Sequence, residues 1–229
     1  MQPDSPDEAA RARQREIVRA GYDAISRTYR DDDGQASPAA PTPADQYRDW
    51  VEELGTLLRP GDRVLDLGCG AGVPTTRQLV EAGFRVTGVD ISAVQIERAR
   101  RLVPDAEFIQ ADMAIWDAAP QSFEAIVSLY ALIHVPLEDQ RQLLPRLARW
   151  LVSGGVLLAI VGHERWTVTE DYFGAEMFWD HADVETYKLW LRDAGFTIEW
   201  DRYIPEGSSG HSLVLARTTD ADAAEAVQP

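Results

Sequence analysis

The sequence predicts an α/β domain built around a mostly parallel sheet. From Pro60 onward, short apolar segments alternate with helical patterns, which is typical of parallel strands joined by crossover helices. Several of these segments are apolar on both faces, as expected for strands covered by helices on each side. The 229 residues are 45% hydrophobic and 26% charged, a globular composition that fits one domain with appendages.

Two helices are expected before the sheet. Val18, Tyr22, Ile25 and Tyr29 recur at helical spacing and predict a helix over about 7–29. A second helix should begin near Pro43, with Thr42 as its N-cap. We expect residues 1–59 to form an amino-terminal helical lid.

The apolar segments after Pro60 are expected as strands over 63–67, 84–90, 106–110, 123–129 and 155–161. Helical patterns lie at 75–83, 93–103, 137–151 and 184–195, and each ends near glycine or proline. Two strand-like runs, 197–204 and 211–217, are joined by PEGSSG and predict a hairpin, so the last strand should enter the sheet antiparallel. Residues 218–229 are low in complexity and are expected to be a mobile tail.

Charge and composition exclude several classes of partner. The net charge of −16 argues against binding nucleic acid or anionic membranes, which depends on clustered basic residues. The one basic cluster, around Arg98, is interpreted as a solvated helix face. No apolar run is long enough to span a bilayer, and the first residues lack the apolar stretch of a secretory signal. We therefore expect a soluble, cytoplasmic protein. Cys69, the single cysteine, is interpreted as a packing residue, and no ligand spacing supports a metal site.

A glycine-rich turn and an acidic strand end form the most informative motif. VLDLGCGAG places Gly68 and Gly70 in a turn after a buried strand, where glycine permits close approach of a ligand. Asp90 ends the next strand, 22 residues after Gly68, and could accept hydrogen bonds from both ribose hydroxyls of a nucleoside. Val73 stands where the nicotinamide-binding fingerprint requires its last glycine.

The combination of VLDLGCGAG with GVDIS resembles the first two motifs of class I S-adenosylmethionine-dependent methyltransferases. The resemblance covers about residues 22–217 and is closest to the small-molecule branch, which has a YDxxSxxY-like first helix and includes enzymes of quinone and natural-product pathways. It implies a Rossmann-like fold: a central seven-stranded, mostly parallel sheet with an antiparallel last strand and helices on both faces. Residues 60–217 would form this cofactor-binding domain.

The resemblance implies contacts with S-adenosyl-L-methionine, and with its product S-adenosyl-L-homocysteine, for ten residues: Tyr22, Tyr29, Gly68, Gly70, Asp90, Ile91, Gln95, Asp112, Met113 and Leu129. Gly68 and Gly70 would pass beneath the methionine part, and Asp90 would hold the ribose. Ile91 would press on the adenine face, and the carbonyl of Leu129 would meet the ammonium group.

Asp112 resembles the family's acid that accepts the adenine amino group, and the Met113 backbone would meet a ring nitrogen. Tyr22 and Tyr29 match helix residues that close over the methionine carboxylate, although both could instead be core residues. Gln95 could simply face solvent.

Catalysis of methyl transfer requires mainly collinear positioning and exclusion of water. A base is needed only when the attacking atom must first lose a proton, as a hydroxyl does. His134 follows the fourth strand at the carboxyl edge of the sheet, where the cofactor sulfur and the acceptor should meet. It is the candidate base or orienting residue. It could instead only order the turn.

The segment at about 162–182 is long for a connection and carries five aromatic residues within 14 positions. We interpret it as an acceptor-site insertion that lines a pocket together with the first helices. The predicted acceptor residues are Trp50, Tyr130, His163, Trp166, Tyr172, Phe173, Phe178 and Trp179. The alternative is that these aromatics only anchor a loop to the sheet.

The predicted function is methyl transfer to a small, aromatic or heteroaromatic acceptor in natural-product metabolism. Residues 164–185 carry seven acidic residues and one basic residue, a net charge of −6, so the acceptor should be neutral or cationic. The alternatives are a nicotinamide-dependent oxidoreductase and a non-catalytic protein that binds S-adenosylmethionine. The sequence leaves open whether oxygen, nitrogen or carbon is methylated, and the oligomeric state.

Overall fold

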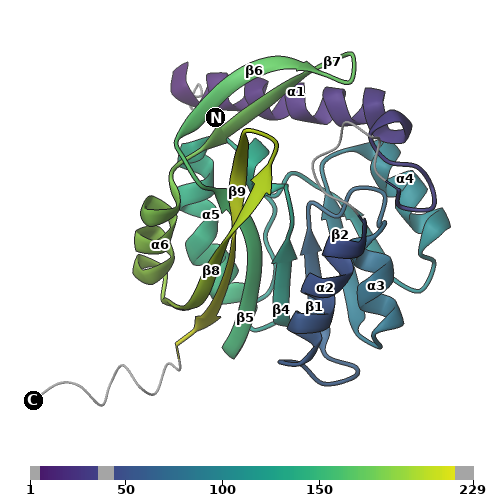
Figure 1. The fold of residues 1–229 in the computed structure, drawn as a ribbon, viewed down its shortest axis with the longest axis vertical. Coiled ribbons are helices and arrows are strands. Elements are labelled where there is room, and N and C mark those ends of the chain that lie inside the picture. Colours follow the sequence, from purple (N-terminus) through teal and green to yellow (C-terminus); the bar gives the residue numbers. More distant parts are fainter. Residues whose placement is uncertain (1–5, 36–43, 220–229) are drawn as a thin grey trace, which may run out of the picture.

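The computed structural model describes residues 6–35 and 44–219. Its elements in chain order are α1 (Pro6–Tyr29), α2 (Ala44–Gly55), β1 (Arg63–Leu67), α3 (Thr75–Glu81), β2 (Arg85–Asp90), α4 (Ala93–Leu102), β3 (Glu107–Gln110), β4 (Phe123–Ser128), the 3-10 helix η1 (Leu132–His134), α5 (Leu137–Trp150), β5 (Leu151–Gly162), β6 (Trp166–Tyr172), β7 (Ala175–His181), α6 (Val184–Asp193), β8 (Phe196–Glu206) and β9 (Ser209–Thr218). Figure 1 shows their arrangement.

The central sheet has seven strands in the order β3-β2-β1-β4-β5-β9-β8. The first five are parallel to one another, and β9 runs antiparallel to both β5 and β8. This confirms the expected topology. The chain winds from β1 toward β3 on one side and from β4 toward β5 on the other, so β1 and β4 flank the point where the winding reverses. In open α/β sheets, ligands bind at this point, outside the carboxyl ends of the strands.

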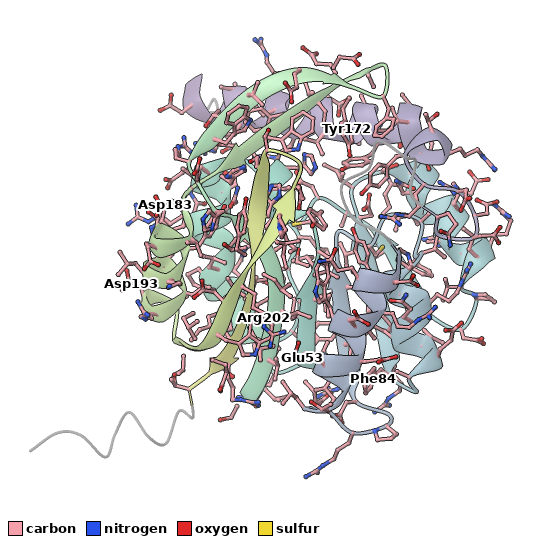
Figure 2. The ribbon with its side chains drawn as sticks, viewed as in Figure 1. Glu53, Phe84, Tyr172, Asp183, Asp193 and Arg202 are labelled. Carbon is pink, nitrogen blue, oxygen red and sulfur yellow. The ribbon has the colours of Figure 1, made fainter. Side chains whose placement is uncertain are left out.

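Helices cover both faces of the sheet because its strands alternate apolar side chains between two core clusters. Leu65 and Leu67 of β1 face the cluster that contains α5 and α6, whereas Val64 faces the cluster that contains α2. Leu54 of α2 is fully buried in the second cluster, and Arg202 of β8 forms an ion pair with Glu53 of α2 (2.6 Å; Figure 2). The second helix therefore belongs to the sheet's helical layer, which corrects the expectation that all of residues 1–59 form a lid.

The segment expected as an acceptor-site insertion forms a β-hairpin, where the sequence had suggested a loop. Strands β6 and β7 form a separate two-stranded sheet, which lies with α1 across the carboxyl ends of the parallel strands (Figure 1). Val18 and Ile25 of α1 pack on Met177 and Phe178 of β7. The two elements approach so closely that a Cβ atom added at Gly21 would lie only 2.8 Å from the backbone oxygen of Glu176.

Two smaller expectations changed. Arg98 is buried, and its guanidinium donates to the backbone oxygens of Ser26 and Arg30 and to Asp32, so it ties α4 to the end of α1 rather than facing solvent. Strand β9 extends to Thr218, one residue into the predicted tail. Residues 220–229 of that tail lie outside the described residues. The same holds for Thr42 and Pro43, the predicted start of the second helix. None of the helices described is long and apolar enough to cross a membrane.

Candidate active site

The turn after β1 brings backbone, rather than side chains, to the cleft. Gly68 and Gly70 both have positive φ, +84° and +54°, which favours glycine. A Cβ atom at Gly68 would lie 2.1 Å from that of Ala131, whereas one at Gly70 would meet only Gln95 Nε2, at 3.8 Å. The chain is therefore closely packed beneath Gly68 and open above Gly70, so a ligand can rest against the Gly70 backbone.

Asp90 is held at the end of β2 by the same turn. Its carboxylate accepts hydrogen bonds from the backbone N–H of Gly70 (2.8 Å) and of Ser92 (2.9 Å). Burial raises the pKa of Asp90 to about 6, despite these two donors. Because a buried carboxylate gains from every further donor, ribose hydroxyls would fit this position.

All ten residues predicted to contact the cofactor line one narrow cavity of about 100 Å³. Its other lining residues are Arg15, Val18, Tyr130, Ala131, His134 and Val135. Gln95 is buried and accepts a hydrogen bond from Ser26 of α1 (2.7 Å), so it does not face solvent. The structure thus brings together residues from α1, the glycine turn and the ends of β2, β3 and β4.

Arg15 of α1 lies beside Asp112 at one end of this cavity. Its Nε lies 2.9 Å from Asp112 Oδ2, and its guanidinium also forms an ion pair with Asp139 of α5. Arg15 was not among the residues predicted from the sequence. It precedes Val18 by three residues and Tyr22 by seven, which places it on the same face of the helix as these two residues.

His134 links α1 to the β6–β7 hairpin. Its Nδ1–H donates to the backbone oxygen of Phe178 (2.7 Å), and its Nε2 accepts from the hydroxyl of Tyr22 (2.9 Å). Burial lowers the pKa of His134 to about 4 and raises that of Tyr22 well above its usual range. The imidazole is therefore neutral at pH 7, the phenol keeps its proton, and both ring nitrogens of His134 are engaged.

A second cavity, of about 950 Å³, adjoins the first. The two share Tyr22, Tyr29, Tyr130 and His134 as walls. Ligand sites commonly have volumes of about 300–1,000 Å³ and aromatic linings. The second cavity is thus large enough for a small organic molecule that reaches the first.

Five of the eight predicted acceptor residues line the second cavity: Tyr130, His163, Trp166, Tyr172 and Trp179. The other three do not. Trp50 packs on Tyr130 inside the core, and Phe178 is buried beneath α1. Phe173, at the hairpin turn, packs on Tyr29 and Tyr172, where Figure 2 shows Tyr172 beside α1.

Several polar residues on this cavity were not predicted from the sequence, namely Glu170, His181, Tyr203, Glu206 and His211. Tyr203, Glu206 and His211 come from the β8–β9 hairpin, whose turn rises beneath β6 and β7 (Figure 1). All four histidines of the chain line this cavity, and no lysine or arginine of the described residues does. Within the same residues, no group of three or more His, Cys, Asp or Glu side chains could hold a metal ion.

Comparison with known proteins agrees with this geometry. Residues 64–155 match a family described as a methyltransferase domain. The chain is 45% identical over 102 residues to trans-aconitate 2-methyltransferase of Paracidovorax citrulli, covering 44% of this chain and 38% of that protein. It is 31% identical over 157 residues to phosphoethanolamine N-methyltransferase 1 of Arabidopsis thaliana, covering 66% of this chain and 31% of that protein.

The chain therefore spans about a third of the length of these two relatives. In fold, it is similar to magnesium protoporphyrin IX methyltransferase from Synechocystis, solved with bound S-adenosylmethionine, with a TM-score of 0.69 and 22% identity over 90% of this chain and 97% of that one. Residues 64–155 thus carry a methyltransferase domain, and the fold around it is similar to that of an enzyme that binds S-adenosylmethionine.

Proposed function

We propose that this protein transfers a methyl group from S-adenosylmethionine to a small, neutral or cationic aromatic acceptor. The observation that carries the proposal is the shared wall between the two cavities. The predicted cofactor residues line the first cavity, and the larger aromatic cavity meets it at Tyr22, Tyr29, Tyr130 and His134. Donor and acceptor held in these cavities would face each other across that wall.

The residues of the first cavity fit this cofactor. The open space above Gly70 would admit its methionine part, and the buried Asp90 carboxylate would accept hydrogen bonds from its ribose. When bound, the cofactor supplies an electrophilic methyl group on a sulfonium. The protein's part is to align the acceptor and to exclude water, for which the buried aromatic walls are suited.

The charge and composition of the second cavity support the class of acceptor. Aromatic side chains from α1, the hairpin and the end of β4 surround it, and Glu164, Glu170 and Glu206 reach it without any lysine or arginine among the described residues. An anionic acceptor would meet an unfavourable potential there. The relatives are named for acceptors as different as trans-aconitate and phosphoethanolamine, so the cavity is the better guide to the acceptor of this chain.

Helix α1 and the β6–β7 hairpin would act as the lid. They lie over the strand ends, and the first cavity is narrow beneath α1. Entry of a ligand the size of S-adenosylmethionine would require α1 to move outward and to close again afterwards, as lids in many enzymes do.

Two measurements test the proposal. A thermal-shift comparison should show stabilisation by S-adenosylhomocysteine and none by NADH; the reverse result would indicate a nicotinamide-dependent oxidoreductase. Incubation with methyl-labelled S-adenosylmethionine and a metabolite extract, followed by mass spectrometry, should yield a labelled product. Tight cofactor binding without any labelled product would favour a non-catalytic binding protein.

A further inference from the structure

A carboxylate and an imidazole form a fixed pair at the turn of the β8–β9 hairpin. His211 Nδ1 lies 3.0 Å from Glu206 Oε2, and the hydroxyl of Tyr130 donates to Glu206 Oε1 (2.6 Å). Only 15% of the His211 side chain and 11% of the Glu206 side chain are exposed. Both oxygens of the carboxylate are thus engaged, which fixes the orientation of the imidazole that it holds.

The pair determines which ring nitrogen of His211 is basic. An ionised carboxylate only accepts hydrogen bonds, so the proton of the neutral imidazole lies on Nδ1 and the lone pair lies on Nε2. Nε2 has no hydrogen-bond partner among residues 6–35 and 44–219. In contrast, both nitrogens of His134 are engaged, by Tyr22 and by the Phe178 backbone.

The other two histidines of the cavity lack a carboxylate partner in the described structure. His163 Nδ1 pairs with the Ser212 hydroxyl (3.0 Å), and His181 Nδ1 donates to the Glu164 backbone oxygen (2.8 Å). A carboxylate stabilises the imidazolium that forms when a histidine takes up a proton, and a hydroxyl or carbonyl does so less well. His211 is therefore the histidine best prepared to accept a proton.

His211 also lies within reach of the wall between the cavities. Its ring lies 5.6 Å from that of Tyr130, measured between centroids, and Tyr130 lines both cavities. The groups that face His211 are Glu206 of β8, Tyr130 after β4 and His181 of β7, whose ring lies 5.4 Å away. An aromatic acceptor spanning this distance would contact both Tyr130 and Nε2.

We propose that His211 is the general base of the methyl transfer, that Glu206 positions it, and that the acceptor group is a hydroxyl. This inference rests on the proposed function. The acceptor oxygen forms a bond to the methyl carbon as the carbon–sulfur bond breaks, and that electron pair stays on sulfur. The hydroxyl proton passes to His211 Nε2, giving an imidazolium paired with Glu206. A hydroxyl needs this base, whereas a neutral amine can lose its proton after attack.

The test uses the intact protein with methyl-labelled S-adenosylmethionine and the metabolite extract. Loss of a general base should slow labelled-methyl incorporation by about 10²- to 10⁴-fold in His211→Ala. Free imidazole should restore part of that rate, because it can occupy the space left by the side chain. Glu206→Gln should also slow the reaction, whereas Glu199→Gln should not; Glu199 lies on the same strand but pairs with Arg217 on the exposed surface.

Two further readouts do not depend on the rate. The ¹³C shift of the transferred methyl should be that of an O-methyl group; an N- or C-methyl product would overturn the proposal. The ¹⁵N spectrum of His211 should show the Nδ1–H tautomer, and Glu206→Gln should change it. An unchanged spectrum, or imidazole rescue of His134→Ala but not of His211→Ala, would overturn the assignment of the base.

Binding of S-adenosylhomocysteine separates this failure from failure of the proposed function. His211→Ala should bind it with the affinity of the unchanged protein, since His211 does not line the first cavity. If the unchanged protein neither binds this ligand nor transfers methyl, the proposed function fails and the base assignment falls with it. If it does both and His211→Ala keeps its full rate, only the base assignment fails.

Discussion

Replacing Arg15 by methionine should lower the free energy of unfolding by about 3 kcal/mol at pH 7. Arg15 is nearly buried, at 9% exposed, and it bridges two carboxylates, Asp112 and Asp139. Methionine keeps much of the apolar stem but removes the charge, so both acids lose a buried partner.

The size of this loss of stability depends on the partners that Asp112 and Asp139 keep in the variant. Breaking a buried ion pair costs about 3–5 kcal/mol, because the remaining charge is left without compensation. Arg11 Nε still lies 2.8 Å from Asp139 Oδ1, and the Ala114 N–H still donates to Asp112 (2.9 Å), so the lower end of that range applies.

Urea unfolding of matched variants measures this. Arg19→Met is the control, since Arg19 lies one turn further along α1 and its side chain, which pairs with Glu16 and Asp23 of the same helix, is 35% exposed against 10% for Arg15. That pairing should contribute far less to stability than the pairing of Arg15, because solvent screens it. If Arg15→Met and Arg19→Met unfold at the same urea concentration, the reasoning that α1 is fastened through Arg15 is refuted.

Three other predictions concern the glycine turn, His134 and Asp66. Gly70→Ala should weaken binding of S-adenosylhomocysteine at least about tenfold and lower the free energy of unfolding by about 1 kcal/mol. Gly68→Ala, whose Cβ would meet Ala131, should lower the free energy of unfolding by about 3 kcal/mol. Isothermal titration and urea unfolding measure the two effects, and a larger loss of stability at Gly70 than at Gly68 would contradict the geometry. Because the pKa of His134 falls to about 4 on folding, its imidazole binds a proton between pH 6.5 and 4 in the unfolded chain but not in the folded protein. The free energy of unfolding should therefore fall by about 3 kcal/mol between pH 6.5 and 4, and His134→Asn should abolish that part of the slope. Burial raises the pKa of Asp66 to about 7, so its contribution is present below pH 4 and is lost as the pH rises to 7; Asp66→Asn should gain stability relative to the unchanged protein at pH 8 but not at pH 4. Equal differences at both pH values would show that Asp66 is not buried as a carboxylate.

The convergence of residues around the first cavity could be predicted from sequence because these residues lie at the ends of successive strands. Parallel strands bring those ends to one edge, so Gly68, Asp90, Asp112 and Leu129 converge even though they are distant in the chain. Arg15 was missed because a charged residue on a helix gives no sign of its partner. For the same reason Arg98, which binds backbone oxygens of α1, was interpreted as a surface residue.

The lining of the second cavity could be predicted only in part. Strand β6 exposes residues on both faces, so WTVTEDY lacks the apolar alternation that identifies a strand, and the hairpin was taken for a loop. Glu206 and His211 lie on the two strands beside the turn of the β8–β9 hairpin, and the sequence indicates that turn but not which cavity it reaches. The aromatic content of the segment was visible, yet burial of Phe178 and Trp50 depends on tertiary packing.

The close approach of α1 to β7 at Gly21 joins the roofs of the two cavities. Since Val18 and Tyr22 line the first cavity and Trp179 of β7 lines the second, a ligand that draws either element inward also moves the other. Binding free energies at two coupled sites are reciprocal. If a bound cofactor raises the affinity for the acceptor by some factor, a bound acceptor raises the affinity for the cofactor by the same factor, and residues at the helix–hairpin contact would set the size of that factor.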